Sequence, residues 1–150
     1  MTETFDKAPF QPGVSETVQV LVIEDDQQYG SLIKRILERK EGPSFHVTWV
    51  DALSPGLERL ARGGVDVVLL DLTLPDSRGL DTFRKANAEA PEVAIVILTG
   101  QDDQGLATTA LQEGAQDYLV KGQSEKALLD RAVLYAIERK RFQGALRESE

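Results

Sequence analysis

The polar residues that follow four apolar segments of this sequence could together carry out phosphoryl-transfer chemistry. In chain order they are Glu24-Asp25-Asp26, Asp71, Thr99 and Lys121. Carboxylates held close together repel one another and raise each other's pKa values, a penalty that Mg²⁺ relieves while bridging to phosphate oxygens. Asp71 would then be the nucleophile of an in-line transfer, and Thr99 and Lys121 would stabilise the phosphoryl oxygens.

Each of these groups also has an ordinary structural interpretation. The acids could simply cap a helix, since Asp25 followed by Gln28 resembles a capping box. Thr99 could belong to a turn and Lys121 to the solvated surface. Asp71 could be no more than the polar residue that ends a strand. The hypothesis of a site depends on four strand ends that supply complementary chemistry to one edge of a sheet.

Apolar periodicity predicts the elements that must position these groups. We expect strands at 18–23, 46–50, 65–70, 93–98 and 117–120, and helices at 29–37, 54–62, 79–90, 103–113 and from Ser124 toward the chain end. This alternation predicts an α/β fold with a doubly wound, five-stranded parallel sheet in the order 2-1-3-4-5. That order places the ends of the first and third strands side by side.

Composition narrows the class of protein. The 150 residues suit one domain, and the formal net charge of -8 argues against nonspecific binding to nucleic acid or anionic membranes. The absence of cysteine excludes disulfides and thiolate metal sites, and the single histidine, His46, excludes a histidine-rich metal site within one chain. No apolar segment approaches the roughly 20 residues that span a bilayer. Residues 1–17 are polar and lack a secretion signal, so we expect a flexible tail on a cytoplasmic protein.

Four short segments follow the order and spacing of a known family's motifs. They are Val20-Leu21-Val22-Ile23-Glu24-Asp25-Asp26, Asp71-Leu72-Thr73-Leu74-Pro75 with Gly79, Ile97-Leu98-Thr99-Gly100, and Gly114-Ala115-Gln116-Asp117-Tyr118-Leu119-Val120-Lys121. Together they resemble the receiver domain of bacterial response regulators over about residues 18–137. The resemblance implies a flavodoxin-like fold and leaves 138–150 as a C-terminal helical extension or linker.

The resemblance implies a phosphoacceptor and a magnesium site. Asp71 matches the aspartate that receives a phosphoryl group from a sensor histidine kinase or a histidine phosphotransfer protein. Asp25 matches the direct Mg²⁺ ligand, Glu24 the acid that acts through bound water, and Thr73 the residue whose backbone carbonyl binds the metal. Asp26 is not expected to be a ligand.

The resemblance also implies a switch. Thr99 matches the hydroxyl that moves toward the phosphoryl group, Tyr118 the aromatic residue that then turns inward, and Lys121 the lysine that pairs with the phosphoryl group. Thr73 and Gln101 occupy the two positions that tune the lifetime of the phosphorylated state. Neither is an acid, so neither is an evident base for the hydrolytic water.

The sequence departs from the family directly after Lys121. The family usually has a proline there, with a cis peptide bond, whereas this chain has Gly122 and then Gln123. A cis bond without proline costs about 2.5–4 kcal/mol. We therefore expect a trans bond, and a loop that Gly122 makes more mobile.

The last predicted helix continues past the receiver-like region. Leu128, Tyr135 and Phe142 recur every seven residues and Leu146 follows four residues later, which favours pairing of this helix with a second copy. A solvated helix end is the alternative. We expect a homodimer, formed through this helix or through the face of the fourth helix, fifth strand and fifth helix. Because the sequence contains no recognisable output domain, it represents either a stand-alone receiver or a piece of a longer protein.

These observations favour a phosphorylation-dependent signalling switch of a two-component phosphorelay, and not an enzyme with an external substrate. The added charge on Asp71 would change which partners the surface prefers. One alternative is a phosphatase of the haloacid dehalogenase type, which needs an acid two residues after the nucleophile, where this chain has Thr73. The other is a receiver-like module that binds partners without phosphorylation, which the departure at Gly122 keeps open.

Overall fold

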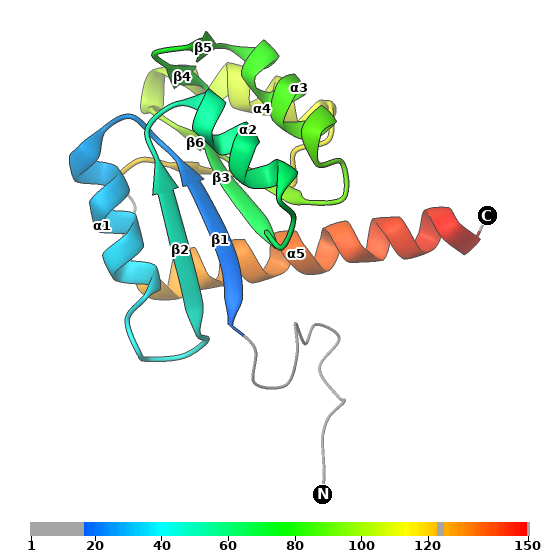
Figure 1. Cartoon of the computed structure of the whole chain (residues 1–150), viewed down its shortest axis with the longest axis horizontal. Helices are drawn as coiled ribbons and strands as arrows, with labels where there is room; N and C mark the ends of the chain where they lie inside the picture. Colours follow the sequence, from blue (N-terminus) through cyan, green and yellow to red (C-terminus); the bar gives the residue numbers. More distant parts are fainter. Residues whose placement is uncertain (1–16, 123–124, 150) are drawn as a thin grey trace, which may run out of the picture.

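The backbone forms one parallel β-sheet with helices on both faces (Figure 1). The computed structural model describes residues 17–122 and 125–149, so the predicted tail lies almost wholly outside the described residues. The strands of the sheet are β1 (Val18–Ile23), β2 (Phe45–Val50), β3 (Val67–Asp71), β6 (Ala94–Thr99) and β7 (Asp117–Val120). Their order is β2-β1-β3-β6-β7 and each neighbouring pair is parallel, which confirms the predicted fold class and the order 2-1-3-4-5.

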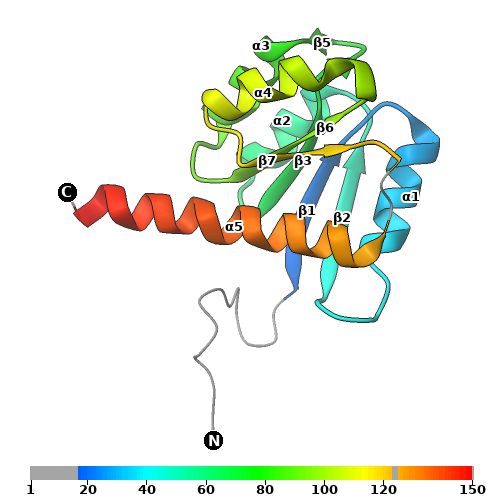
Figure 2. The same ribbon diagram turned by 180° about the vertical axis from the view of Figure 1, so that it is seen from behind.

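Two helices cover one face of the sheet and three cover the other (Figures 1 and 2). The first pair is α1 (Gln27–Leu37) and α5 (Lys126–Ser149), and the other three are α2 (Leu53–Ala61), α3 (Leu80–Glu89) and α4 (Gln104–Gln112). Strand side chains alternate between the two cores: in β1, Val20 and Val22 face α1 and α5, whereas Leu21 and Ile23 face the three-helix layer. Because both faces are covered, the central strands are apolar almost throughout.

The starts of α2 and α4 differ from the prediction, and at α2 a distant residue is the reason. α2 begins at Leu53 and not at Ser54, because Asp76 accepts hydrogen bonds from the backbone N–H groups of Leu53 and Ser54, at 2.8 and 2.9 Å. Asp76 lies beyond β3, so this cap exists only in the folded chain. Before α4, a 3-10 helix at Gln101–Asp103 takes the place of the predicted α-helical start at Asp103.

The segment after β3 forms a small hairpin, where the sequence pattern predicted only a turn. β4 (Thr73–Leu74) pairs antiparallel with β5 (Ser77–Arg78). The hairpin closes with a hydrogen bond of 2.7 Å from the N–H of Gly79 to the carbonyl of Leu72. Gly79 has a φ of 77°, a conformation that side-chain-bearing residues rarely adopt. The hairpin thereby holds Thr73 beside the end of β3.

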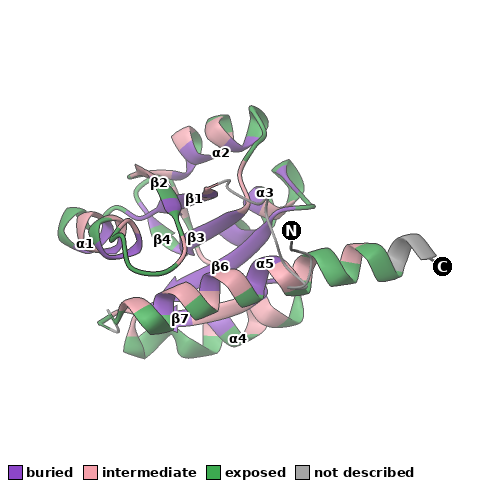
Figure 3. Ribbon diagram, turned by 90° about the horizontal axis from the view of Figure 1, so that it is seen from below, coloured by how far each residue is buried: buried purple, intermediate pink, exposed green. Residues whose placement is uncertain are grey.

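The last helix extends past the edge of the sheet, as predicted (Figures 1 and 3). Its first half packs on the sheet through Leu129, Val133, Ala136 and Ile137. Part of the predicted extension is also attached to the body. The guanidinium of Arg139 donates to the carbonyl of Gln116 at 2.7 Å, and the side-chain amide of Gln116 donates to Gln143 at 3.1 Å. Across residues 17–122 and 125–149, no helix has the length and apolar content needed to cross a bilayer.

α1 packs on β2 at a glycine. A Cβ at Gly30 would overlap the indole ring of Trp49, whose Nε1 donates to the backbone carbonyl of Glu24 at 2.8 Å. Glycine inside a helix costs about 1 kcal/mol relative to alanine. Close packing on the indole requires this glycine, and the contact ties β2 to the end of β1.

We predict that Gly30→Ala destabilises the fold. The new methyl group overlaps a rigid ring, and overpacking of this kind costs about 1–3 kcal/mol, more than the gain in helix propensity. Urea unfolding followed by the fluorescence of Trp49 measures the change. Gly105→Ala in α4 is the matched control, because no atom of the described residues lies within 4 Å of its added Cβ. An unfolding free energy equal to or above that of the original chain would contradict the packing argument.

Candidate functional site

Strand register brings two acids together at the carboxyl edge of the sheet. Ile23 of β1 pairs with Leu70 of β3. The next residues along the two strands are Glu24 and Asp71, so they lie side by side, as the order 2-1-3-4-5 predicts. Both are buried, with exposed fractions of 0% for Glu24 and 6% for Asp71. This edge is where open α/β sheets place their ligands.

Three acids form a cluster that could hold a cation. Glu24, Asp25 and Asp71 each offer a carboxylate oxygen, and these oxygens lie within 4.8 Å of one another. Asp25 is exposed to solvent, whereas the other two acids are buried. A set of hard oxygen donors with one open side suits Mg²⁺, which keeps several of its waters. The three predicted metal-binding acids therefore do lie together.

The third acid of the sequence motif has a different task. Asp26 is the N-cap of α1, because its Oδ1 accepts hydrogen bonds from the N–H groups of Gln28 and Tyr29, at 3.0 and 3.2 Å. The alternative in which Asp25 and Gln28 form a capping box is thus wrong. With Asp26 at the cap position, Asp25 is left for the cluster.

Burial makes Glu24 hard to ionise. Desolvation, followed by its hydrogen bond with Asp71, raises the pKa of Glu24 to about 7, although Lys121 and the N–H of Asp26 act in the opposite direction. The N–H of Asp26 donates to Glu24 Oε2 at 3.0 Å. Glu24 is therefore easily protonated at neutral pH, and an additional positive charge at this edge would favour its ionised form.

Lys121 places a positive charge beside the two buried acids. Its Nζ lies 3.0 Å from Asp71 Oδ2, to which it donates a hydrogen bond, and 2.8 Å from Glu24 Oε1, without hydrogen-bond geometry. Burial alone would lower the pKa of Lys121, but its contacts with the two acids outweigh burial and raise it. Lys121 thus contacts Asp71 directly, and its predicted pairing with a phosphoryl group remains a prediction.

The departure at Gly122 does not displace Lys121. The described residues contain no cis peptide bond, so the predicted trans bond is confirmed. Gly122 has a φ of 103°, in the region that favours glycine. The backbone N–H of Lys121 donates to the carbonyl of Thr99 at 2.8 Å, which continues the β6–β7 ladder up to the lysine.

Of the predicted switch and lifetime residues, Thr99 ends β6 at this edge and Gln101 follows it, whereas Tyr118 lies within β7. Thr99 is buried and its hydroxyl donates to the carbonyl of Gly100 at 3.0 Å. Tyr118 is half-buried against the three-helix core, and Gln101 is exposed. The N–H of Thr73 donates to Asp71 Oδ1 at 3.0 Å. The roles predicted for these residues, including a metal contact by the carbonyl of Thr73, remain predictions.

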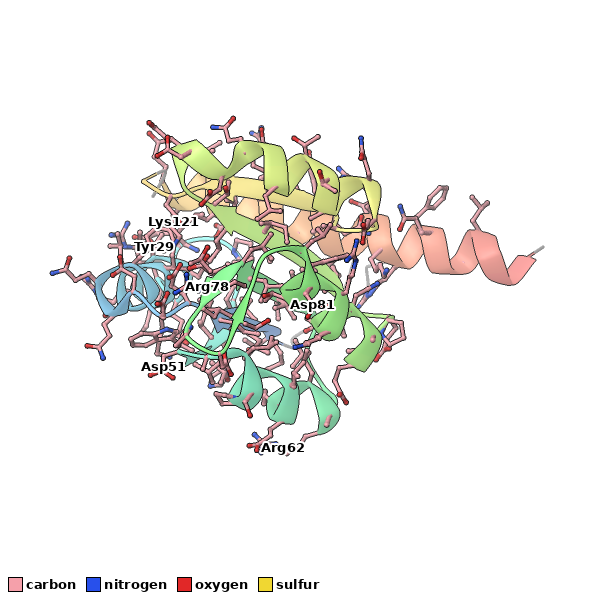
Figure 4. All side chains as sticks on the ribbon, turned by 90° about the horizontal axis from the view of Figure 1, so that it is seen from above. Tyr29, Asp51, Arg62, Arg78, Asp81 and Lys121 are labelled. Atoms are coloured by element: carbon pink, nitrogen blue, oxygen red, sulfur yellow. The ribbon has the colours of Figure 1, made fainter. Side chains whose placement is uncertain are left out.

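Two aromatic residues near the site were not predicted from the sequence to belong to it. The ring of Tyr29, which periodicity assigned to the core, lies under the ammonium of Lys121, with 5.6 Å between Nζ and the ring centroid (Figure 4). Trp49 contacts the backbone of Glu24, so it lies close to the acidic cluster. Neither residue carries a sequence signal for this placement, since both contacts join separate elements.

Comparisons with known proteins identify the family of this chain. A family model described as "Response regulator receiver domain" matches residues 20–133. The swarming motility regulation protein RssB of Serratia marcescens is 36% identical over 104 residues, which cover 69% of this chain and 46% of that protein. The sensory transduction protein RegX3 of Mycolicibacterium smegmatis is 34% identical over 112 residues, covering 75% of this chain and 47% of RegX3. The chain thus spans about half the length of these relatives.

Solved structures show the same fold. A response regulator receiver domain protein from Clostridium thermocellum superposes with a TM-score of 0.73 at 31% identity, over 84% of this chain and 98% of that one. Full-length FixJ from B. japonicum gives a TM-score of 0.74 at 27% identity, over 83% of this chain and 60% of FixJ. The resemblance inferred from the motifs is confirmed, and the chain belongs to the response regulator receiver domain family.

Proposed function

We propose that this chain is a phosphorylation-dependent switch that accepts a phosphoryl group on Asp71 from a histidine kinase or a histidine phosphotransfer protein. The observation that carries the proposal is the environment of Asp71. Its Oδ2 accepts a hydrogen bond from Lys121 and its Oδ1 accepts one from the N–H of Thr73, in a cluster with the buried Glu24 and the exposed Asp25. A carboxylate held by donors on both oxygens is oriented for attack on phosphorus.

The metal in this proposal is Mg²⁺. Asp25 and Asp71 would bind it directly, Glu24 through water, and the carbonyl of Thr73 would complete the protein ligands. When bound, Mg²⁺ supplies positive charge that stabilises the oxygens of the transferred phosphoryl group. The hard-oxygen cluster and the raised pKa of Glu24 support this assignment.

The residues of the chain perform the transfer itself. A carboxylate oxygen of Asp71 forms a bond to phosphorus while the phosphorus–nitrogen bond of the donor phosphohistidine breaks, and the departing imidazole keeps the electron pair and takes up a proton. Lys121 already lies 3.0 Å from Asp71, so its ammonium is in place to stabilise the phosphoryl oxygens. Because the donor phosphohistidine is made from ATP, the proposal also places the chain in the cytoplasm.

The switch follows from the new charge on Asp71. The hydroxyl of Thr99 would exchange its hydrogen bond to Gly100 for one to a phosphoryl oxygen, and Tyr118 would turn from its half-buried position into the space that Thr99 leaves. The surface of α4, β7 and α5 then changes its preference for partners. Thr73 and Gln101 would set how long the phosphorylated state lasts.

We propose in addition that the chain associates with a second copy through α5. Leu128, Tyr135 and Phe142 are 43%, 55% and 67% exposed, so the seven-residue repeat lies on the solvent side of the helix. Leu146, four residues farther on, is 54% exposed. A repeat of seven on one helix face is the pattern by which a helix pairs with a copy of itself. This observation favours α5 over the α4–β7–α5 face as the site of association.

Phosphorylation of Asp71 is the first prediction of this proposal. Acetyl phosphate with Mg²⁺ should add one phosphoryl mass to the intact chain, and Asp71→Asn should abolish the addition, since no carboxylate nucleophile remains. Asp66→Asn is the control, because Asp66 accepts from the N–H of Gln19 away from the acidic cluster. A chain that stays unmodified while a known receiver is labelled would refute the proposal. Turnover of a generic phosphate ester would favour the phosphatase instead.

A second prediction concerns pH and Mg²⁺. The pKa of Glu24 in the fold, about 7, lies above its ordinary value of 4.5, so the folded state holds the proton more tightly than the unfolded chain. This contribution to stability is complete below about pH 4.5 and is lost as the pH rises through about 7, by up to about 3 kcal/mol. Mg²⁺ favours the ionised acid and should therefore stabilise the fold more at pH 8 than at pH 5.

Urea unfolding followed by Trp49 fluorescence measures both effects. Glu24→Gln should remove most of the pH dependence and weaken the Mg²⁺ effect, whereas Glu58→Gln, on an exposed position of α2, should change neither. If the unfolding free energy of Glu24→Gln depends on pH in the same way as that of the original chain, Glu24 is not the source of the pH dependence of stability.

The third prediction concerns self-association. Phe142→Glu places a charge within the apolar repeat and should shift the chain from dimer to monomer in sedimentation velocity. Ala127→Glu, at an exposed position of α5 outside the repeat, should leave the dimer intact. A chain that sediments as a monomer without any substitution would refute association through α5.

A further inference from the structure

The ammonium of Lys121 lies over an aromatic ring as well as between two acids. Its Nζ is 5.6 Å from the ring centroid of Tyr29, within the range of a cation–π contact. Tyr29 comes from the first turn of α1, and Lys121 follows β7, so the contact joins two elements far apart in the sequence (Figure 4). The ring is therefore a third partner for the lysine, beside Glu24 and Asp71.

The ring of Tyr29 is buried in the core, and its backbone is fixed by a helix cap. Tyr29 is 8% exposed and belongs to the core between the sheet and the helices α1 and α5. Asp26 caps the helix start with a hydrogen bond to the N–H of Tyr29, which fixes the backbone of this residue. A ring with so little freedom can restrict the position of a flexible lysine side chain without losing further entropy of its own.

Gly122, which follows Lys121, gives the lysine no such support. It has a φ of 103°, and among the described residues no atom lies within 4 Å of an added Cβ. The backbone of Lys121 is fixed by Thr99, but the side chain extends past that point. Of its two acidic partners, only Asp71 accepts a hydrogen bond, and Asp71 is the group that would change its charge and shape on phosphorylation.

We propose that Tyr29 is a positioning residue, whose ring holds the ammonium of Lys121 over the acidic edge for phosphoryl transfer to Asp71. The proposal rests on the function proposed above and adds a residue to it. The negative face of the ring attracts the ammonium, and its interaction does not depend on the state of Asp71. The hydroxyl of Tyr29 has no hydrogen-bond partner among the described residues, so the ring is the part that acts on Lys121.

Three variants of the full chain separate the ring from the rest of the side chain. Tyr29→Leu keeps an apolar group in the core but removes the aromatic face. Tyr29→Phe keeps the face and removes the hydroxyl, so it is the rescue variant. Phe45→Leu is the matched control, since Phe45 is a buried aromatic under another lysine, with Lys126 Nζ 5.3 Å from its centroid, and it begins β2 at the opposite edge of the sheet.

The first measurement is the rate at which acetyl phosphate with Mg²⁺ adds a phosphoryl group to the chain. Tyr29→Leu should slow the reaction about fivefold to tenfold, and Tyr29→Phe should recover most of the rate. Phe45→Leu should react like the original chain even where it is less stable. Made in a Lys121→Ala background, Tyr29→Leu should have no further effect, because the ring acts only through the lysine.

The second measurement does not need phosphorylation. The protons next to the ammonium of Lys121, identified by their loss in Lys121→Ala, should show an upfield ring-current shift in the original chain and in Tyr29→Phe. The shift should disappear in Tyr29→Leu. This readout reports where the lysine lies, and a purely structural role of Tyr29 in the core would not predict it.

The outcomes distinguish the two proposals. An original chain that takes up no phosphoryl group refutes the proposed function. A chain that is labelled normally, beside a Tyr29→Leu variant with an equal rate, refutes the positioning role of Tyr29 alone. The same role is refuted if Tyr29→Leu slows the reaction equally in the Lys121→Ala background, or if Lys121 shows no ring-current shift.

Discussion

Two buried carboxylates at the ends of adjacent strands are the constraint on which the rest of this structure depends. The parallel register of β1 and β3 puts Glu24 beside Asp71, with almost no exposure to solvent for either. Burying two like charges is unfavourable unless an opposite charge accompanies them. Lys121 supplies one such charge, and the pKa of about 7 at Glu24 shows that one ammonium only partly offsets the cost.

α1 serves this edge in several ways. Its N-cap is Asp26, the acid of the motif that does not belong to the cluster. One turn later, Tyr29 lies under Lys121, and Gly30 lets the indole of Trp49 approach and bind the carbonyl of Glu24. α1 thus packs its apolar face on the sheet and also shapes the polar site. For this reason the sequence pattern assigns its residues to the core and not to the site.

β7 connects the site with the extended helix. Lys121 directly follows this strand, at the acidic edge, and Gln116 directly precedes it, where Arg139 and Gln143 of α5 form hydrogen bonds with it. Tyr118 lies between them and is half-buried. The strand therefore links the acidic edge, through the hydrogen bonds at its other end, with the part of α5 that projects from the body. The exposed apolar repeat of α5 has the spacing of a helix-pairing surface.

The sequence by itself determined the fold class, the strand order and the members of the acidic cluster, because apolar runs and the acids that end them are local patterns. It also determined the apolar repeat of α5, since a period of seven needs no tertiary contact to be seen. Only the tertiary structure decided that Asp26 caps α1, that Asp76 starts α2, and that Tyr29 and Trp49 reach the site. These contacts join residues far apart in the chain or depend on side-chain direction, and both are set by packing, which no local pattern records.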